Sequence, residues 1–264
     1  MDQAVSRLYA ENPTGRFSNR AEDYAKYRPT YPPEAIALIL SGLGNPTGLA
    51  AADVGAGTGI SARLLADRGV RVVAIEPNIA MREAAEAHPG VEFWDGTAEQ
   101  TRLLAQSIDL VLCCQSFHWF NQPLALAEFH RILKPRGRLA LMWNDRDETD
   151  AFTGEHGQII HQFADRRIYS DKRRKSPELL AHSLLFRNFR SEIFQHVQRL
   201  DREGLIGLVL SASYVPKTGD AHEQLIQHLS ELFDRWADAA GEVALAYSTY
   251  LYWAEPVDAG DSSD

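Results

Sequence analysis

The chain has 264 residues, 45% of them hydrophobic, and a formal net charge of −9. This length and apolar content suffice for one large α/β domain with its own core. The acidic balance argues against an extended nucleic-acid interface, which needs clustered Lys and Arg. The only cysteines, Cys113 and Cys114, are adjacent and form no disulfide framework, so we expect a cytoplasmic location. Without a signal-like segment or a run of about 18 apolar residues, we expect no membrane span.

Up to Asn144, strand-like and helix-like segments alternate along the chain. After a basic N-terminal segment, helices are expected over residues 33–44, 60–68 and 79–88. The expected strands are residues 49–54, 71–75, 91–94, 109–114 and 138–143. Strands that alternate with helical runs predict a parallel, doubly wound sheet.

The alternation of short strand-like and helix-like segments ends after Asn144. Residues 145–190 are polar and helix-like, residues 192–200 resemble a strand, and residues 203–213 and 221–240 are again helix-like. Residues 242–255 return to a period of two, which predicts a half-buried strand. The residues expected on its one face are Val243, Leu245, Tyr247, Thr249, Leu251 and Trp253. The tail after Pro256 is expected to fray.

Three glycines at alternate positions stand between the first predicted strand and the next helix, in the sequence Asp-Val-Gly-Ala-Gly-Thr-Gly at residues 53–59. Such a turn lets the backbone approach a nucleotide-like ligand. A dinucleotide motif would need its third glycine at position 60, and a P-loop would end in Gly-Lys-Ser/Thr. Asp53 could meet an amine but would repel a phosphate. S-adenosylmethionine fits these requirements; an ordinary strand–helix turn is the alternative.

Two further strand ends carry carboxylates. Glu76 follows the second predicted strand about 20 residues after the glycines, where a carboxylate can reach ribose hydroxyls; a solvated glutamate is the alternative. Pro77 suits the first turn of the next helix, although Asn78 could equally be its N-cap. Residues 95–99, Asp-Gly-Thr-Ala-Glu, follow the third strand and could recognise an adenine through a carboxylate and backbone amides.

With these motifs, the chain resembles the class I S-adenosylmethionine-dependent methyltransferases. It is most similar to the small-molecule branch called methyltransferase type 11, which includes trans-aconitate methyltransferase-like enzymes. The matching segments are residues 53–59, 74–78, 95–99, 116–120 (Ser-Phe-His-Trp-Phe) and 131–141, with residues 17–32 similar to the N-terminal segment of that branch. The resemblance implies a Rossmann-like, three-layer αβα fold. Its seven-stranded sheet would be mostly parallel, with an antiparallel C-terminal edge and helical lid insertions.

The resemblance also implies a single domain with three parts. Residues 15–45 would cover the cofactor, residues 46–145 would form the cofactor-binding core, and residues 146–264 would supply lid helices and the C-terminal strands. The cofactor would be S-adenosyl-L-methionine, with S-adenosyl-L-homocysteine as product and no metal. The implied cofactor-binding residues are Phe17, Tyr24, Arg28, Asp53, Gly55, Ala56, Gly57, Thr58, Gly59, Glu76, Pro77, Met81, Gly96, Thr97, Ala98, Glu99, Gln115 and Ser116.

The loop after the fourth predicted strand is expected to face the methyl acceptor. His118 could be a general base, a cationic anchor for a substrate carboxylate, or a residue that only orients the loop. The predicted substrate-binding residues are Tyr27, His118, Trp119, Trp143 and Asn144. The nine histidines show no metal-ligand spacing, and His156 and His161, five residues apart, are poorly placed for one helical face.

Two charged or aromatic segments have alternative interpretations. Tyr24, Tyr27, Arg28 and Tyr31 could fold over the methionine part of the cofactor, with Arg28 pairing to its carboxylate, or could form a surface strap. The basic cluster is Arg166, Arg167, Lys172, Arg173, Arg174 and Lys175. It could be a solvated helix face, could attract an anionic substrate, or could contact nucleic acid.

We therefore expect a methyltransferase acting on a small, possibly anionic molecule, with O-methylation of a carboxylate or hydroxyl favoured and nucleic acid disfavoured. The absence of an Asn/Asp-Pro-Pro-Tyr motif and of a Pro-Cys pair argues against nucleobase methylation. The alternatives are a protein or nucleic-acid methyltransferase and a cofactor-binding protein that does not methylate. The acceptor, the need for a base and the oligomeric state stay open.

Overall fold

A computed structural model describes residues 20–165 and 176–257 of the chain. These residues form a seven-stranded sheet with the order β3-β2-β1-β4-β5-β7-β6. The strands are β1 Ala50–Val54, β2 Arg71–Ile75, β3 Val91–Trp94, β4 Ile108–Cys114, β5 Leu133–Arg146, β6 Phe186–Leu200 and β7 Val243–Pro256. β1 to β5 are parallel, whereas β7 runs antiparallel to both β5 and β6. The predicted mostly parallel sheet with an antiparallel C-terminal edge is confirmed.

Helices cover both faces of the sheet, as the alternating pattern predicts. They are α1 Ala21–Tyr27, α2 Pro33–Leu40, α3 Ile60–Ala66, α4 Ile79–Glu83, α5 Gln122–Ile132, α6 Ala151–Phe163, α7 Ser176–Ala181, α8 Arg202–Leu210 and α9 Asp220–Trp236. Short 3-10 helices, η3 Pro46–Gly48 and η4 Phe117–Trp119, lie in the loops before β1 and after β4.

The sheet separates two apolar cores. On one face Ile36 of α2 and Leu65 of α3 pack with Ala51 of β1. On the other face Phe129 of α5 packs with Ala52, the next residue of β1. Successive strand residues thus point to opposite cores, which explains why β1 and β4 are almost continuously apolar.

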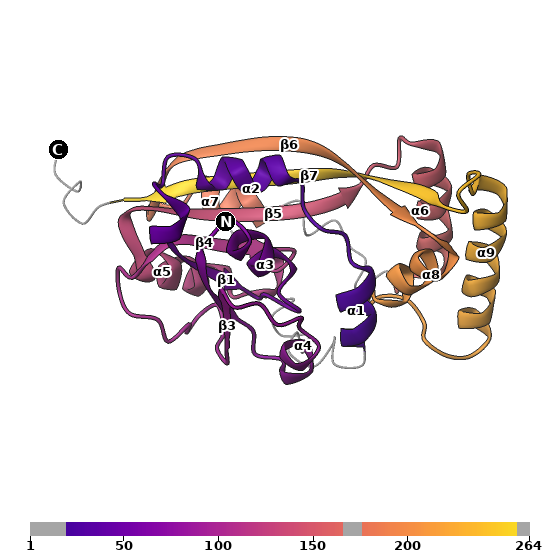
Figure 1. Cartoon of the computed structure of the whole chain (residues 1–264), viewed down its shortest axis with the longest axis horizontal. Coiled ribbons are helices and arrows are strands. Elements are labelled where there is room, and N and C mark those ends of the chain that lie inside the picture. Colours follow the sequence, from indigo (N-terminus) through magenta and orange to yellow (C-terminus); the bar gives the residue numbers. More distant parts are fainter. Residues whose placement is uncertain (1–19, 166–175, 258–264) are drawn as a thin grey trace, which may run out of the picture.

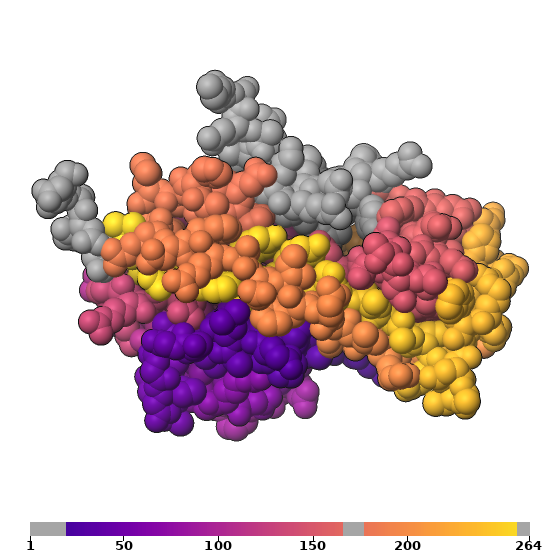
Figure 2. Space-filling model, turned by 90° about the horizontal axis from the view of Figure 1, so that it is seen from above, coloured from indigo at the N-terminus to yellow at the C-terminus, as the bar shows by residue number. Residues whose placement is uncertain are grey.

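Figure 1 shows that the long strands β5, β6 and β7 extend from the parallel part of the sheet to a group of helices, α6, α8 and α9. Two further apolar clusters lie there, formed by residues such as Phe152 of α6, Leu205 of α8 and Leu232 of α9 packed with Leu245 of β7. In Figure 2 the indigo and purple residues of the N-terminal half occupy one end of the molecule and the yellow residues of α9 the other. The predicted buried face of β7 is confirmed, because Val243, Leu245, Tyr247, Thr249, Leu251 and Trp253 are all buried.

Several boundaries differ from the predictions for local reasons. The Asn78 side chain accepts the N–H of Ala80 and caps α4, so Pro77 lies before the helix and its placement in the first turn was wrong. α4 ends at Glu83, five residues before the predicted end. β6 begins at Phe186, six residues before its predicted start, because Phe186, Arg187, Arg190 and Ser191 pair with β7, with an irregularity between Arg187 and Arg190.

Side-chain caps mark the start of two of the C-terminal helices. Asp150 accepts the N–H of Thr153 at 2.9 Å before α6, and Asp201 accepts the N–H of Gly204 at 2.7 Å before α8. Within the described ranges, no helix is both long and apolar enough to cross a membrane.

Candidate functional site

A cavity of about 380 Å³ opens at the carboxyl ends of the parallel strands. This is where ligands bind in open α/β sheets, and the volume falls within the range of about 300–1,000 Å³ typical of small-molecule sites. Its lining comes from the glycine turn after β1, the loops after β2, β3 and β4, the start of α5, and α1. The lining residues are Tyr24, Gly55, Gly57, Glu76, Pro77, Asn78, Met81, Gly96, Thr97, Ala98, Glu99, Cys114, Gln115, Ser116, Trp119, Phe120, Asn121 and Leu124.

The glycine turn brings the backbone of β1 close to the loop after β4. A Cβ atom added to Gly55 would lie 2.6 Å from the Cβ of Ser116, whose hydroxyl donates to the carbonyl of Val54 at 2.7 Å. Gly57 has φ +59°, in the left-handed region that favours glycine. The turn therefore places bare backbone at the cavity, as a closely bound ligand requires.

Glu76 is held rigidly at the end of β2. One carboxylate oxygen accepts the N–H of Gly57 at 2.8 Å and the other accepts the N–H of Asn78 at 2.9 Å. Burial raises the pKa of the carboxyl, and these two backbone N–H groups counteract that rise. A carboxylate has about four lone-pair sites, so each oxygen retains one for a ligand hydroxyl. Glu76 is thus preorganised to accept hydrogen bonds from a vicinal diol.

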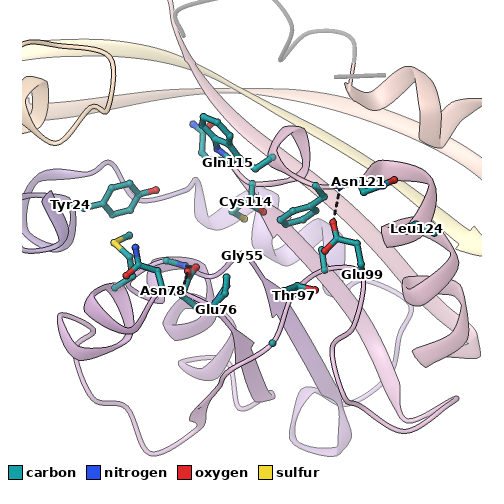
Figure 3. A pocket seen from close by; sticks show the side chains of 18 residues that line it. Tyr24, Gly55, Glu76, Asn78, Thr97, Glu99, Cys114, Gln115, Asn121 and Leu124 are labelled. Atoms are coloured by element: carbon teal, nitrogen blue, oxygen red, sulfur yellow. Dashed lines mark hydrogen bonds between the residues drawn. The ribbon is translucent and has the colours of Figure 1, made fainter. Parts of the chain in front are cut away.

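The loop after β3 forms the opposite side of the cavity (Figure 3). Glu99 accepts the N–H of Asn121, the residue before α5, at 2.7 Å. Asp95 instead forms an ion pair with Arg82 at 3.5 Å and does not line the cavity. The carboxylate available to a ligand in this loop is that of Glu99.

Gln115 provides an acceptor at the end of β4. It adopts φ +55°, and its amide nitrogen donates to the carbonyl of Asn144 at 2.9 Å. Its side-chain oxygen is buried and has no hydrogen-bond partner among the residues that the structure describes. An unpaired buried acceptor is costly, which makes this oxygen a natural partner for a ligand N–H.

Four residues of the predicted motif lie outside the cavity lining. Asp53 is fully buried and accepts the hydroxyl of Ser61 at 2.6 Å, so its expected contact with a ligand amine is not made. Ala56 packs in the core, Thr58 is fully buried, and Gly59 is the N-cap of α3. Contacts with neighbouring elements account for two of these positions: Ser61 of α3 contacts Asp53, and a Cβ atom on Gly59 would lie 2.8 Å from Phe93 of β3.

The burial of Asp53 leads to a testable prediction. Burial raises its pKa to about 7, far above the ordinary value of an aspartate. The neutral Asp53 carboxyl therefore stabilises the folded state. This stabilisation is lost as the pH rises from the pKa of Asp53 in the unfolded chain through 7. The melting temperature of Asp53→Asn relative to the wild type should be higher at pH 8 than at pH 5. Thermal melts at both pH values test this, and an equal difference at both would contradict the buried, neutral carboxyl.

The predicted substrate-binding residues divide into two groups. Trp119 lines the cavity, whereas His118 and Trp143 are buried beside each other, the Trp143 indole N–H donating to His118 Nδ1 at 3.3 Å. Asn144 donates to the carbonyl of Thr30 at 2.9 Å and accepts the Thr249 hydroxyl at 2.7 Å. His118, Trp143 and Asn144 thus do not line this cavity, and their predicted contact with a substrate stays a prediction.

Only part of the N-terminal segment that contains Tyr24, Tyr27 and Arg28 lies at the cavity. Tyr24 lines it, but Tyr27 packs against α8 instead. The Arg28 guanidinium carbon lies 4.7 Å from the centre of the Tyr24 ring and its Nη2 donates to the carbonyl of Ser211 at 3.3 Å, so it does not line the cavity as predicted. Phe17 and the basic cluster at residues 166–175 lie outside the described residues.

Sequence reasoning missed five lining residues: Asn78, Cys114, Phe120, Asn121 and Leu124. Leu124, in the first turn of α5, is 56% exposed, which only the structure shows. Cys114 is the last residue of β4 and is buried. Among the described residues, no group of three or more His, Cys, Asp or Glu side chains could hold a metal ion.

Comparison with known proteins matches this part of the chain to a family. Residues 52–141, which run from β1 into β5 and include most of the cavity, match the family model described as a methyltransferase domain. Residues 52–141 are therefore similar to a methyltransferase domain. The model is that of the type 11 family, so that part of the resemblance is confirmed, while the trans-aconitate methyltransferase-like branch stays a prediction.

Two relatives are similar to this chain over about 150 residues each. The chain is 39% identical over 150 residues to the uncharacterized methyltransferase Rv3342 of Mycobacterium tuberculosis, covering 56% of this chain and 60% of that protein. It is 32% identical over 148 residues to the uncharacterized methyltransferase C25B8.09 of Schizosaccharomyces pombe, covering 55% and 59%. The matches thus span about 60% of the length of these relatives.

Solved structures share the fold beyond the methyltransferase domain. A protein from Anaeromyxobacter dehalogenans superimposes with a TM-score of 0.64 at 19% identity, covering 87% of this chain and 98% of that chain. The phosphoethanolamine N-methyltransferase 2 of Haemonchus contortus gives a TM-score of 0.53 at 15% identity, covering 98% and 62%. At these identities the likeness shows the Rossmann-like fold alone.

Proposed function

We propose that the protein is an S-adenosylmethionine-dependent methyltransferase that methylates a small organic molecule, with a carboxylate or hydroxyl oxygen as the favoured acceptor. The observation that carries this proposal is the Glu76 carboxylate, fixed by the N–H groups of Gly57 and Asn78 at the cavity. That arrangement suits the two hydroxyls of a ribose, and the unphosphorylated adenosine of this cofactor needs no phosphate cradle. The match of residues 52–141 to a methyltransferase domain supports the same assignment.

The residues around Glu76 fit the remaining parts of the cofactor. Gly96, Thr97 and Ala98, with Phe120 and Leu124, would hold the flat adenine ring between backbone and apolar side chains. The partnerless oxygen of Gln115 would accept an N–H of the cofactor's amino group. Tyr24 would close the cavity beside Gly57, because its ring lies 3.7 Å from the position of a Gly57 Cβ.

The bound cofactor supplies a methyl group on a sulfonium, which is a good leaving group. The protein's contribution is therefore alignment of the acceptor with that methyl, worth about 7–11 kcal/mol of the barrier. Trp119 and Tyr24 would enclose the acceptor side of the cavity and exclude water, which favours a reaction that neutralises charge. A carboxylate acceptor would need no base from these residues. We also propose the division into a covering segment (15–45), a core (46–145) and a lid-bearing C-terminal part (146–264).

An assay with methyl-labelled S-adenosylmethionine tests the proposal. The purified protein would be incubated with a panel of small carboxylic acids, phenols and amines, and binding of the cofactor would be measured in parallel by calorimetry. We expect label in at least one acid or hydroxyl compound. Transfer to amines alone, the chemistry named for the Haemonchus contortus protein, would overturn O-methylation. Cofactor binding without transfer to any compound would favour a non-methylating role.

The role of His118 stays a prediction, and its buried position gives it no support. Because the Trp143 N–H donates to Nδ1, the neutral ring carries its proton on Nε2. If His118 acts on the acceptor, His118→Ala should lower the rate of methyl transfer by about 100-fold, as removal of a general base does, while cofactor affinity stays unchanged.

A variant of its partner provides the control for His118. Trp143→Phe removes the indole N–H and leaves the histidine ring in place. An equal loss of rate in both variants would show that His118 only orients the loop. A base further predicts activity that rises with pH through the histidine pKa, whereas a cationic anchor predicts activity that falls.

A further inference from the structure

The wall of the cavity that Tyr24 provides is attached to a distant part of the chain. Tyr24 lies on α1, and α1 is bound at both of its ends to α8 or to residues beside it. At the N-terminal end, the buried Arg20 guanidinium donates to the carbonyls of Leu210, Ala212 and Val215 at the end of α8 and just beyond. A cation at the carboxyl end of a helix also interacts favourably with the helix dipole.

The C-terminal end of α1 packs on α8 without any space between them. A Cβ atom on Gly207 would overlap the Cδ2 and Cε2 of Tyr27 and lie 2.7 Å from its Cζ. The Tyr27 hydroxyl donates to Glu203 of α8 at 2.6 Å, and Lys26 also pairs with Glu203. The Tyr27 carbonyl accepts the side-chain amide of Gln198 at 2.8 Å. The ring of Tyr27 is therefore seated directly on the backbone of α8.

On its other side α1 faces the parallel part of the sheet across a crevice. This crevice has a volume of about 460 Å³ and lies between α1, with the residue before it, and α4, with the residue after it. Figure 1 shows α1 standing between the parallel strands and α8. Hydrogen bonds and close packing thus tie α1 to α8, while polar space separates it from α4.

We propose that Gly207 is a positioning residue for cofactor binding, because it sets the position of α1 and hence of Tyr24 over the cavity. The inference rests on the proposed function, since the cavity is taken as the S-adenosylmethionine site. Tyr24 precedes Tyr27 by one helical turn, so a side chain at position 207 that displaces the Tyr27 ring displaces Tyr24 with it. Because Gly207 has no side chain, α1 can pack closely on α8 and hold Tyr24 in place as a wall of the cavity.

Calorimetry of S-adenosylhomocysteine binding to Gly207→Ala tests the inference. We expect the Kd to rise by about tenfold or more, because a displacement of about an ångström is enough to misplace a binding group. Gly204→Ala is the matched control: it lies on the same helix, gains the same helix propensity, and its Cβ faces Asp201 and Leu200 instead of α1. Its Kd should stay within about twofold of the wild type.

A second substitution separates positioning from general damage to α8. Tyr27→Leu removes the ring that the new methyl group would meet. In that background Gly207→Ala should change the Kd by less than about twofold, so the two substitutions should be strongly non-additive. An equal rise in Kd in both backgrounds would overturn the proposal, as would an unchanged Kd in Gly207→Ala alone.

A variant at the other end of α1 keeps the proposal testable if Gly207→Ala does not fold. Arg20→Met removes the donors to the end of α8, and we expect the same rise in Kd. Arg202→Met is its control, because Arg202 joins α8 to α9 through Asp234 and Ser230 and has no contact with α1 in these bonds. Wild-type protein that does not bind would refute the proposed function itself, whereas binding that neither variant weakens would refute only the role of α8.

Discussion

Glu76→Gln is expected to weaken the binding of S-adenosylmethionine by about 100-fold, because hydrogen bonds to a charged acceptor contribute about 1.5–3 kcal/mol each. The carboxylate accepts N–H groups from Gly57 and Asn78 with its two oxygens, and each oxygen retains a lone pair for a ribose hydroxyl. In glutamine one of these oxygens becomes an NH2 group. That NH2 group would face a backbone N–H. The variant would therefore lose a hydrogen bond to the ribose and also one of the two backbone hydrogen bonds that orient the side chain of residue 76.

Titration calorimetry with S-adenosylmethionine and S-adenosylhomocysteine measures this effect. Glu92→Gln is a suitable control, because Glu92 is an exposed residue on the neighbouring strand β3 and its substitution changes the net charge equally. The control should bind like the wild type. Equal affinities of Glu76→Gln and wild type would show that the ribose is not bound at the end of β2, and would remove the main support for the proposed function.

Gly57→Val is expected to abolish cofactor binding. Gly57 has φ +59°, and a Cβ atom there would approach Met81 Cε to 3.2 Å and Tyr24 Cε1 to 3.7 Å, both in residues that line the cavity. The valine would therefore fill the space that the cofactor needs beside Glu76. Because a β-branched residue is strained in the left-handed region, the variant should also lose about 1–3 kcal/mol of stability.

Backbone strain and occupation of the cavity can be separated with a second glycine. Gly42 has φ +81°, and no atom of the described residues lies within 4 Å of a Cβ atom placed there, so Gly42→Val carries a comparable strain outside the cavity lining. Thermal melts should show a similar loss of stability in both variants. Calorimetry should show that only Gly57→Val loses cofactor binding. Loss of binding in both would attribute the effect to destabilisation and not to the cavity.

The parallel, doubly wound part of the sheet and the strand ends at which a ligand would bind could be predicted from local patterns. Alternating strand-like and helix-like runs placed β1 to β4 within one residue at either end, because buried parallel strands are short, apolar and bounded by turns. Gly55 and Gly57 of the glycine turn, Glu76 and residues 96–99 line the cavity. Because these residues directly follow the end of a strand, their position can be predicted without knowing which distant segments contact them.

The side-chain environments around the cavity depended on segments far away in the sequence. Asn144 is covered because Thr30 and Thr249 hydrogen-bond to it, more than 100 residues away in either direction. β6 extends to Phe186 because pairing with β7 supplies hydrogen bonds that a polar sequence can use as well as an apolar one.

The sequence by itself determined the first four strands, the glycine turn and the carboxylate that would bind a ribose, since each depends on residues within one βα unit. Only the tertiary structure decided that His118 and Asp53 are buried and that α1 is attached to α8 at Gly207. These features depend on which surfaces meet after the chain has folded. A local pattern shows that a residue lies at the end of a strand, but the packing of a distant helix decides whether its side chain reaches the cavity.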